Sequence, residues 1–354
     1  MTYLRILIGL AISIACVIAL LTQINLELTV AALGRAQPAG LALAVGVLLV
    51  TMLTKSYRWG LLYYPTRGLH FGNLTSALFI GYMVSSLVPM RLGELVRAYL
   101  IGKKEPVTFS QSVGTILVEK VLDIVTILGF LAVLGLVMPL PPQVAGSAPL
   151  LVATGLGGLA VLFGLAWLPR EKVLRVLARL QLYVPGTRRW NLVKILGPFL
   201  EALAILRYWR VLPALAFWSV LNWSLSALIS YVVMIAMDVP APFAAAIFLM
   251  VVSNLGMVVP SAPGYVGVFH ALAVLSLGAF GVDPSYAMGY AVVLHATVYS
   301  TFIIVGLLCA WRGGYRLSDL RPGQGGAAPA PPADVGAPLA APVVATSGDR
   351  SISA

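Results

Sequence analysis

The chain has 354 residues, of which 60% are hydrophobic and only 10% charged, and its mean hydropathy is +0.96. Soluble globular domains carry about 25% charged residues, so this composition excludes a water-soluble fold and favours a single polytopic membrane body. The formal net charge of +11 comes from Lys and Arg residues that lie beside apolar segments and form few clusters of consecutive basic residues. Because nucleic-acid-binding regions usually carry such clusters, no nucleic-acid partner is expected.

Six apolar stretches are long enough to cross a bilayer as helices. A hydrocarbon core of about 30 Å requires about 20 residues at the helical rise of about 1.5 Å per residue. No small-residue cleavage site follows the first stretch, so we expect a retained span rather than a signal peptide. Lys55 and Arg58, near the end of the second stretch, are expected to snorkel toward the membrane surface. The predicted spans are residues 6–24, 39–62, 113–137, 150–168, 211–237 and 286–311.

Two further apolar regions are interrupted by proline. One stops before Pro89 and resumes at Leu92, and the other stops before Pro260 and resumes near Tyr265. Proline ends the preceding helix, and each half is too short to cross the membrane, so both regions are predicted to be re-entrant helical hairpins. Broken backbone at membrane depth is tolerated only where it is buried in protein or lines a polar cavity. The two breaks therefore predict a cavity.

The basic residues predict the orientation of the chain. With the N-terminus in the cytoplasm, every Lys and Arg except Arg35 and Lys120 falls on the cytoplasmic side, which places both termini there. The two hairpins then open from opposite sides of the membrane, as in transporters built from inverted repeats, whose sites lie near the midplane. The predicted fold is an all-α polytopic membrane protein with six spans and two re-entrant hairpins in an inverted-repeat arrangement.

The remaining regions are a loop and a tail. Residues 169–210, within a transmembrane domain covering 1–312, are predicted to form a cytoplasmic amphipathic loop whose basic residues serve topology or attract anionic lipids. Residues 313–354 are rich in Gly, Ala and Pro and are predicted to be a disordered cytoplasmic tail. Cys16 and Cys309 lie inside apolar stretches, so neither a disulfide framework nor a metal site is expected.

Charged residues gather around the first hairpin. An ionisable group at the bilayer centre costs at least about 2.5–3.5 kcal/mol, so each needs a partner or a function. Three of these residues recur every third position after Pro89, and two carboxylates four residues apart share one face of the next span, where they require a cation. The members are Arg91, Glu94, Arg97, Glu119, Lys120 and Asp123.

Three interpretations of this cluster are open. It forms a buried ion-pair network that fixes the hairpin; or Arg91 and Arg97 bind a phosphate while the carboxylates orient them; or Glu119 or Asp123 carries a proton. The second hairpin opens another half-helix, whose N-terminus would face the same anion. Its candidate residues are Gly264, Tyr265, Gly267 and His270, although a lone histidine in a span is more often a packing residue.

Three segments carry a resemblance to a known family. VPMRLGELVR at residues 88–97 and EKVLD at 119–123 resemble the lysylphosphatidylglycerol synthase transmembrane-region family, also called the flippase-like domain, as in the membrane half of the multiple peptide resistance factor. PSAPGYVGVF at 260–269 is similar to its second signature. The resemblance covers about residues 5–312. It implies a multi-pass protein of the bacterial inner (plasma) membrane that moves lipids or lipid-linked groups between leaflets.

Some members of that family carry a soluble aminoacyl-transfer domain, which is not expected here, so lysine transfer is not expected either. Lys120 stands where relatives often carry Arg, and His270 where many carry Glu. The lysine at position 120 weakens the case for bidentate binding of an anion there, and the histidine at position 270 weakens the case for a proton-transfer role there.

The predicted function is lipid transport without a cofactor, metal or catalytic residue. The substrate would be an anionic phospholipid or a lipid-linked phosphate, and association into a homo-oligomer is left open. The alternatives are a membrane enzyme or a non-transporting scaffold acting on lipid-linked envelope precursors. If Arg91 and Arg97 hold the head group, Arg97→Ala should abolish transport while the amount of protein stays normal. Equal loss of folded protein would favour the ion-pair network.

Overall fold

The fold is described by a computed structural model that covers residues 2–65, 68–88, 92–139, 145–183, 192–257 and 261–315. Arg91, Pro89, Pro260 and most of the predicted tail lie outside these ranges. Within them the ordered elements are helices, and no strand occurs.

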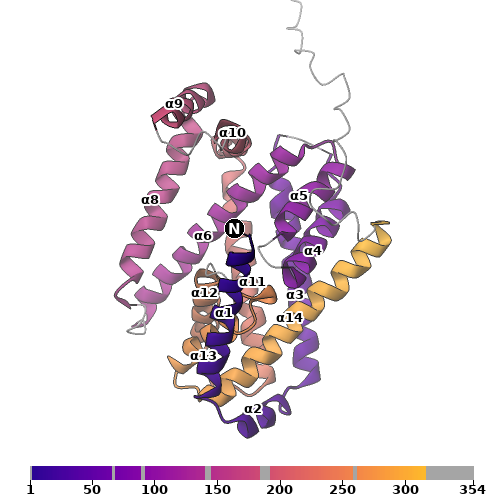
Figure 1. The fold of residues 1–354 in the computed structure, drawn as a ribbon, viewed down its shortest axis with the longest axis vertical. Coiled ribbons are helices and arrows are strands. Elements are labelled where there is room, and N and C mark those ends of the chain that lie inside the picture. The colour runs from indigo at the N-terminus through magenta and orange to yellow at the C-terminus, as the bar shows by residue number, and fades with distance from the viewer. Residues whose placement is uncertain are drawn as a thin grey trace, which may run out of the picture.

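The long helices confirm the predicted membrane spans (Figure 1). Five helices are long and apolar enough to cross a bilayer, and α1 with the short α2, which follows at a bend of 97°, makes a sixth candidate. The chain is therefore an all-α polytopic membrane protein. The helices are α1 (Thr2–Leu21), α2 (Leu26–Leu33), α3 (Pro38–Leu61), α6 (Phe109–Val137), α8 (Ala148–Trp167), α11 (Leu212–Ala236) and α14 (Pro284–Arg312).

α2 was not predicted from the sequence. Its N-cap is Asn25, whose side chain accepts hydrogen bonds from the backbone N–H groups of Glu27 and Leu28. Because such a cap satisfies donors that the first turn leaves unpaired, the chain begins a new helix at Leu26, a short turn after α1 ends at Leu21.

Two pairs of shorter helices form the predicted hairpins. α4 (Phe71–Leu87) and α5 (Gly93–Lys104) pack against each other, as do α12 (Phe243–Gly256) and α13 (Val268–Gly278). In the first pair the backbones come very close, because a Cβ added to Gly81 would lie 2.8 Å from the carbonyl oxygen of Gly93. Glycine at both positions permits this approach.

The tips of the two hairpins meet. The short 3₁₀ helix η3 (Pro263–Tyr265) packs against α4, and a Cβ on Gly264 would lie 3.2 Å from the carbonyl oxygen of Ser86. Gly264 and Gly267 have φ angles of +68° and +86°, which glycine adopts without strain. The second motif therefore supplies the tight turns that bring this break against the first.

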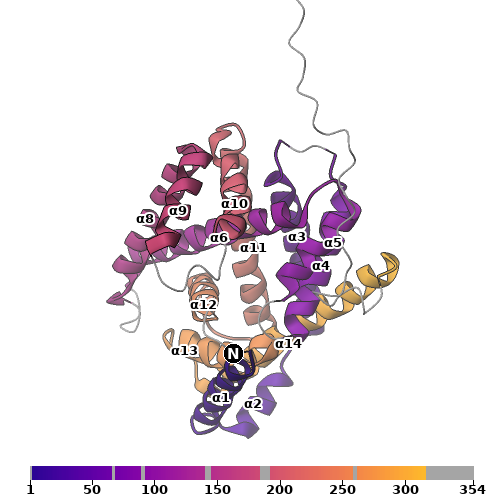
Figure 2. The same cartoon turned by 45° about the horizontal axis from the view of Figure 1, so that its top comes forward.

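The loop predicted to be amphipathic is helical. It contains α9 (Arg170–Tyr183), α10 (Leu192–Leu203) and the 3₁₀ helix η2 (Ala204–Arg207). α8, α9 and α10 lie together at one side of the molecule, where α8 and α10 pack on α6 (Figure 2). The Arg207 side chain donates hydrogen bonds to the carbonyl oxygens of Ala166 and Leu168, which fixes the end of α8.

Candidate functional site

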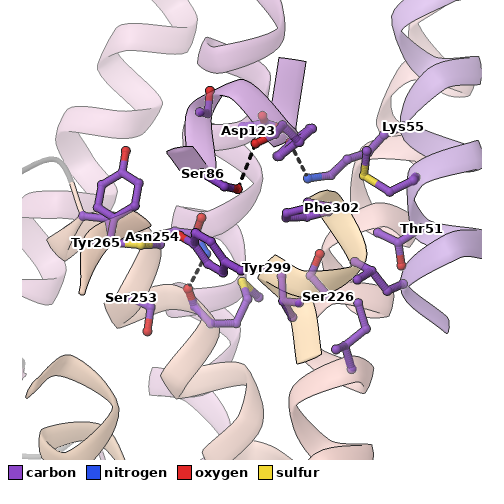
Figure 3. A pocket seen from close by; sticks show the side chains of 18 of the residues that line it. Thr51, Lys55, Ser86, Asp123, Ser226, Ser253, Asn254, Tyr265, Tyr299 and Phe302 are labelled. Carbon is purple, nitrogen blue, oxygen red and sulfur yellow. Dashed lines mark hydrogen bonds between the residues drawn. The ribbon is translucent and has the colours of Figure 1, made fainter. Parts of the chain in front are cut away.

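A cavity of about 450 Å³ lies between the two hairpins and the helices around them (Figure 3). Its lining comes from α3, α4, α5, α6, α11, α12, η3, α13 and α14, and it includes Ser86 near the end of α4 and Tyr265 in η3. The cavity expected from the two broken regions is thus present where their tips meet. Its volume falls within the range of about 300–1,000 Å³ that is usual for small-molecule sites.

Buried ion pairs form the charged side of this cavity. The Arg97 Nη2 atom lies 2.7 Å from Glu119 Oε2, and Arg58 Nη2 lies 2.7 Å from Asp123 Oδ1 and 3.4 Å from Glu119 Oε1. Glu119 thereby joins two guanidinium groups, one on α3 and one on α5. The side chains of Arg58 and Glu119 are 0% and 2% exposed, so water does not screen this network.

The prediction that Arg58 snorkels to the membrane surface is wrong. α3 packs along α11 and also contacts α6, so this part of the helix faces protein rather than lipid. The guanidinium donates to Ser219 Oγ at 3.0 Å in addition to its carboxylate partners. Arg58 is the cation that the two acids on α6 were expected to require, together with Arg97.

A second, more accessible ion pair joins α5 and α6. Lys120 Nζ lies 2.9 Å from Glu94 Oε1, and the two side chains are 35% and 32% exposed. Both residues line the cavity. Each of the three carboxylates in the cluster therefore has a basic partner within 3 Å.

Lys55 also lines the cavity instead of snorkelling, which corrects the second half of that prediction. Its Nζ donates to the Tyr82 hydroxyl at 3.1 Å and lies 5.3 Å from the ring centroids of both Tyr82 and Trp223. Across the described residues it forms no ion pair with a carboxylate. The Trp223 indole N–H instead donates to Asp123 Oδ1 at 3.2 Å.

The rest of the lining is uncharged but polar in places. The Ser253 hydroxyl is buried and, within the described residues, has no hydrogen-bond partner. Asn254 donates to the carbonyl oxygen of Met250 at 2.8 Å, and the rings of His295 and Tyr299 stack 4.0 Å apart. Figure 3 shows Lys55, Asn254 and Tyr299 around the same space.

The predicted site residues divide into three groups. Those that line the cavity are Glu94, Arg97, Lys120, Asp123 and Tyr265.

Those that lie behind the lining support it. Glu119 holds the two arginines, Gly264 and Gly267 shape the tip of the second hairpin, and His270 stacks at 5.0 Å on His295, which does line the cavity. Arg91 forms the third group, because it lies outside the described residues.

Lys55 and Arg58 were missed as site residues. The signal that points to Arg58 is the pair of carboxylates on α6, which exceeds what Arg97 alone can balance. For metals, no three His, Cys, Asp or Glu side chains of the described ranges gather in a way that could hold an ion.

Comparison with known proteins agrees with this architecture. The family model described as lysylphosphatidylglycerol synthase TM region matches residues 6–306. The glycosyltransferase AglD of Haloferax volcanii is 24% identical over 341 residues, covering 84% of this chain and 53% of that protein. The UPF0104 membrane protein MJ1078 of Methanocaldococcus jannaschii is 25% identical over 228 residues, covering 64% of this chain and 92% of that protein. The chain spans about half the length of AglD. Because the family model matches nearly all the helices of the chain, the chain belongs to the lysylphosphatidylglycerol synthase transmembrane-region family.

Proposed function

We propose that the chain moves a lipid between the two leaflets by passing its anionic head group through the cavity between the hairpins. The observation that carries this proposal is a cavity with a charged wall inside an apolar helical body, at the point where two broken membrane segments meet. Irregular backbone and buried charge are both costly in a bilayer, and both are concentrated at this position.

The lining also has the mixed character that an amphiphile requires. Lys55, Arg97 and Lys120 supply positive charge, whereas Leu249 and Leu294 supply apolar surface. Such a cavity would hold a polar head group while the acyl chains stay among apolar groups. The distribution of basic residues supports an orientation with both termini in the cytoplasm. The family resemblance implies that the membrane is a bacterial inner membrane.

A cavity-filling variant tests transport. Ser226 lines the cavity on α11, and Ser226→Phe would occupy space through which the head group passes. We expect the rate at which fluorescent phosphatidylglycerol crosses the bilayer of proteoliposomes to fall to that of protein-free liposomes, while wild type accelerates it.

The matched control is Ser300→Phe, which adds the same ring at an exposed position on α14. With this variant, the lipid should cross the bilayer as fast as with wild type. If wild type does not accelerate crossing with or without a proton gradient, or if Ser226→Phe transports normally, the proposal fails.

A second candidate is a membrane enzyme that transfers a group to or from a lipid-linked substrate. The similarity to a protein named glycosyltransferase AglD favours it, and Glu94 and Asp123 are carboxylates on the cavity wall. Both carboxylates are held by basic partners, which makes them poor general bases. A lipid product of altered mass, formed by purified wild-type protein, would favour this candidate over transport.

A further inference from the structure

The charges at the cavity are unequally satisfied. Glu94, Glu119 and Asp123 each have a basic partner within 3 Å, whereas Lys55 has only a phenol oxygen and two aromatic faces. The described part of the chain therefore presents an unmatched cation to the cavity and no unmatched carboxylate. A buried charge without a counter-charge is costly, and an anionic ligand would supply the missing partner.

The same pairing of charges disfavours a ligand that carries an amine. A primary ammonium would need a carboxylate, and each carboxylate here would first have to leave its own cation. Breaking the Arg58–Asp123 contact would leave a guanidinium group that is 0% exposed with only its longer contact, 3.4 Å, to the Glu119 carboxylate. A cationic group on the ligand would also meet Lys55.

The uncharged polar groups suit hydroxyls instead. Within the described residues, the buried Ser253 hydroxyl has no hydrogen-bond partner and the Asn254 side-chain oxygen accepts no hydrogen bond. Ser226 Oγ donates to the carbonyl oxygen of Asn222 at 2.9 Å and can still accept a hydrogen bond. These groups line the same cavity as Lys55, at positions on α11 and α12.

We propose that the ligand is a phosphodiester lipid whose head group is uncharged and bears hydroxyls, such as a glycerol or a sugar, and that Lys55 binds its phosphate. This inference rests on the proposed function for the route the lipid takes, but it concerns which lipid binds. Arg58 and Arg97 act as positioning residues that pair with Asp123 and Glu119, so that these two carboxylates are already neutralised when the ligand enters. Lys55 then selects anionic lipids over zwitterionic and cationic ones.

Binding measurements test this selectivity without depending on transport. Purified protein in detergent would be titrated calorimetrically with short-chain phosphatidylglycerol, phosphatidylethanolamine and lysylphosphatidylglycerol. We expect wild type to bind phosphatidylglycerol at least about tenfold more tightly than either amine-bearing lipid, because an ammonium group would meet Lys55 and carboxylates that already have basic partners. A tenfold difference corresponds to about 1.4 kcal/mol. Lys55→Gln should lose about tenfold or more in affinity for phosphatidylglycerol, and Lys55→Arg should recover most of it.

The control is Lys172→Gln, which removes one positive charge from an exposed position on α9 and should bind like wild type. Lys55→Gln keeps a hydrogen-bond donor beside Tyr82, and an unfolding midpoint equal to that of Lys172→Gln would show that its fold is intact.

The outcomes separate this inference from the transport proposal. Lys55-dependent binding of phosphatidylglycerol by a protein that moves no lipid would sustain the inference and overturn transport. Transport by wild type with equal binding of lysylphosphatidylglycerol, or with unchanged binding by Lys55→Gln, would overturn the inference alone. Displacement of the lipid by an equal concentration of soluble glycerophosphoglycerol would overturn the assignment to a lipid, because acyl chains would then contribute nothing.

Discussion

Replacing Glu119 by Gln is expected to destabilise the folded protein by about 3–5 kcal/mol, the usual cost of removing one partner from a buried ion pair. The Glu119 carboxylate lies between Arg58 and Arg97, whose side chains are 0% and 4% exposed. A neutral amide leaves both guanidinium groups without this counter-charge. Arg58 retains Asp123, so the larger loss should occur on the α5 side of the network, at Arg97.

The measurement is the unfolding midpoint of the purified protein in detergent, compared with Glu27→Gln. Glu27 lies exposed on α2, and its replacement removes the same charge at a place where water screens it. Glu27→Gln should therefore behave like wild type. A Glu119→Gln protein as stable as this control would show that the buried network contributes little to the fold.

The same geometry bears on Arg97→Ala. Since Arg97 donates to Glu119 at 2.7 Å and its guanidinium lies 4.4 Å from the centroid of the Trp59 ring, its removal should lower the amount of folded protein along with any activity. That result would favour the ion-pair interpretation for Arg97. The phosphate-binding interpretation would then pass to Lys55, which is engaged by no carboxylate in the described residues.

The membrane spans could be predicted because length and hydropathy alone decide whether a helix can cross a bilayer. α3, α6, α8, α11 and α14 each lie close to a predicted stretch. The hairpins were predictable for a different reason, which is that a proline inside an apolar stretch usually breaks or kinks the helix. α2 escaped prediction because its eight residues are too few to produce a clear periodic pattern.

The charged site was only half predictable. Glu94, Arg97, Lys120 and Asp123 stand out because charge is rare in such a chain, and each of them reaches the cavity. Arg58 is equally charged, but it lies near the end of a span, where sequence alone cannot distinguish a side chain that snorkels from one that faces protein.

The distinction depends on which helix covers the last turns of α3. That helix is α11, more than 100 residues away in the sequence. Lys55 shows the same limit, since its neighbours Tyr82 and Trp223 come from α4 and α11. Tertiary packing decides the environment of both Lys55 and Arg58, and no local sequence pattern reveals that environment.

Replacing Gly93 by Ala is expected to prevent the first hairpin from closing. A Cβ at Gly93, the first residue of α5, would overlap the carbonyl oxygen of Gly81 and the Ser85 hydroxyl, both on α4. A flexible side chain could move aside, but the backbone of α4 cannot do so without parting the two helices. Overpacking usually costs about 1–3 kcal/mol, and an overlap with backbone should reach the upper end of that range or exceed it.

Gly72→Ala supplies the control, because Gly72 also lies on α4 but a Cβ there meets no atom within 4 Å. Alanine favours a helix over glycine by about 1 kcal/mol, so this variant should be as stable as wild type or slightly more so. Unfolding midpoints and the yield of monodisperse protein in size-exclusion chromatography would compare the two. Because α5 carries Glu94 and Arg97 to the cavity, any Gly93→Ala protein that folds should also bind phosphatidylglycerol more weakly. Equal stability and equal binding in the two variants would mean that α4 and α5 are not held this closely, and the cavity would need another means of alignment.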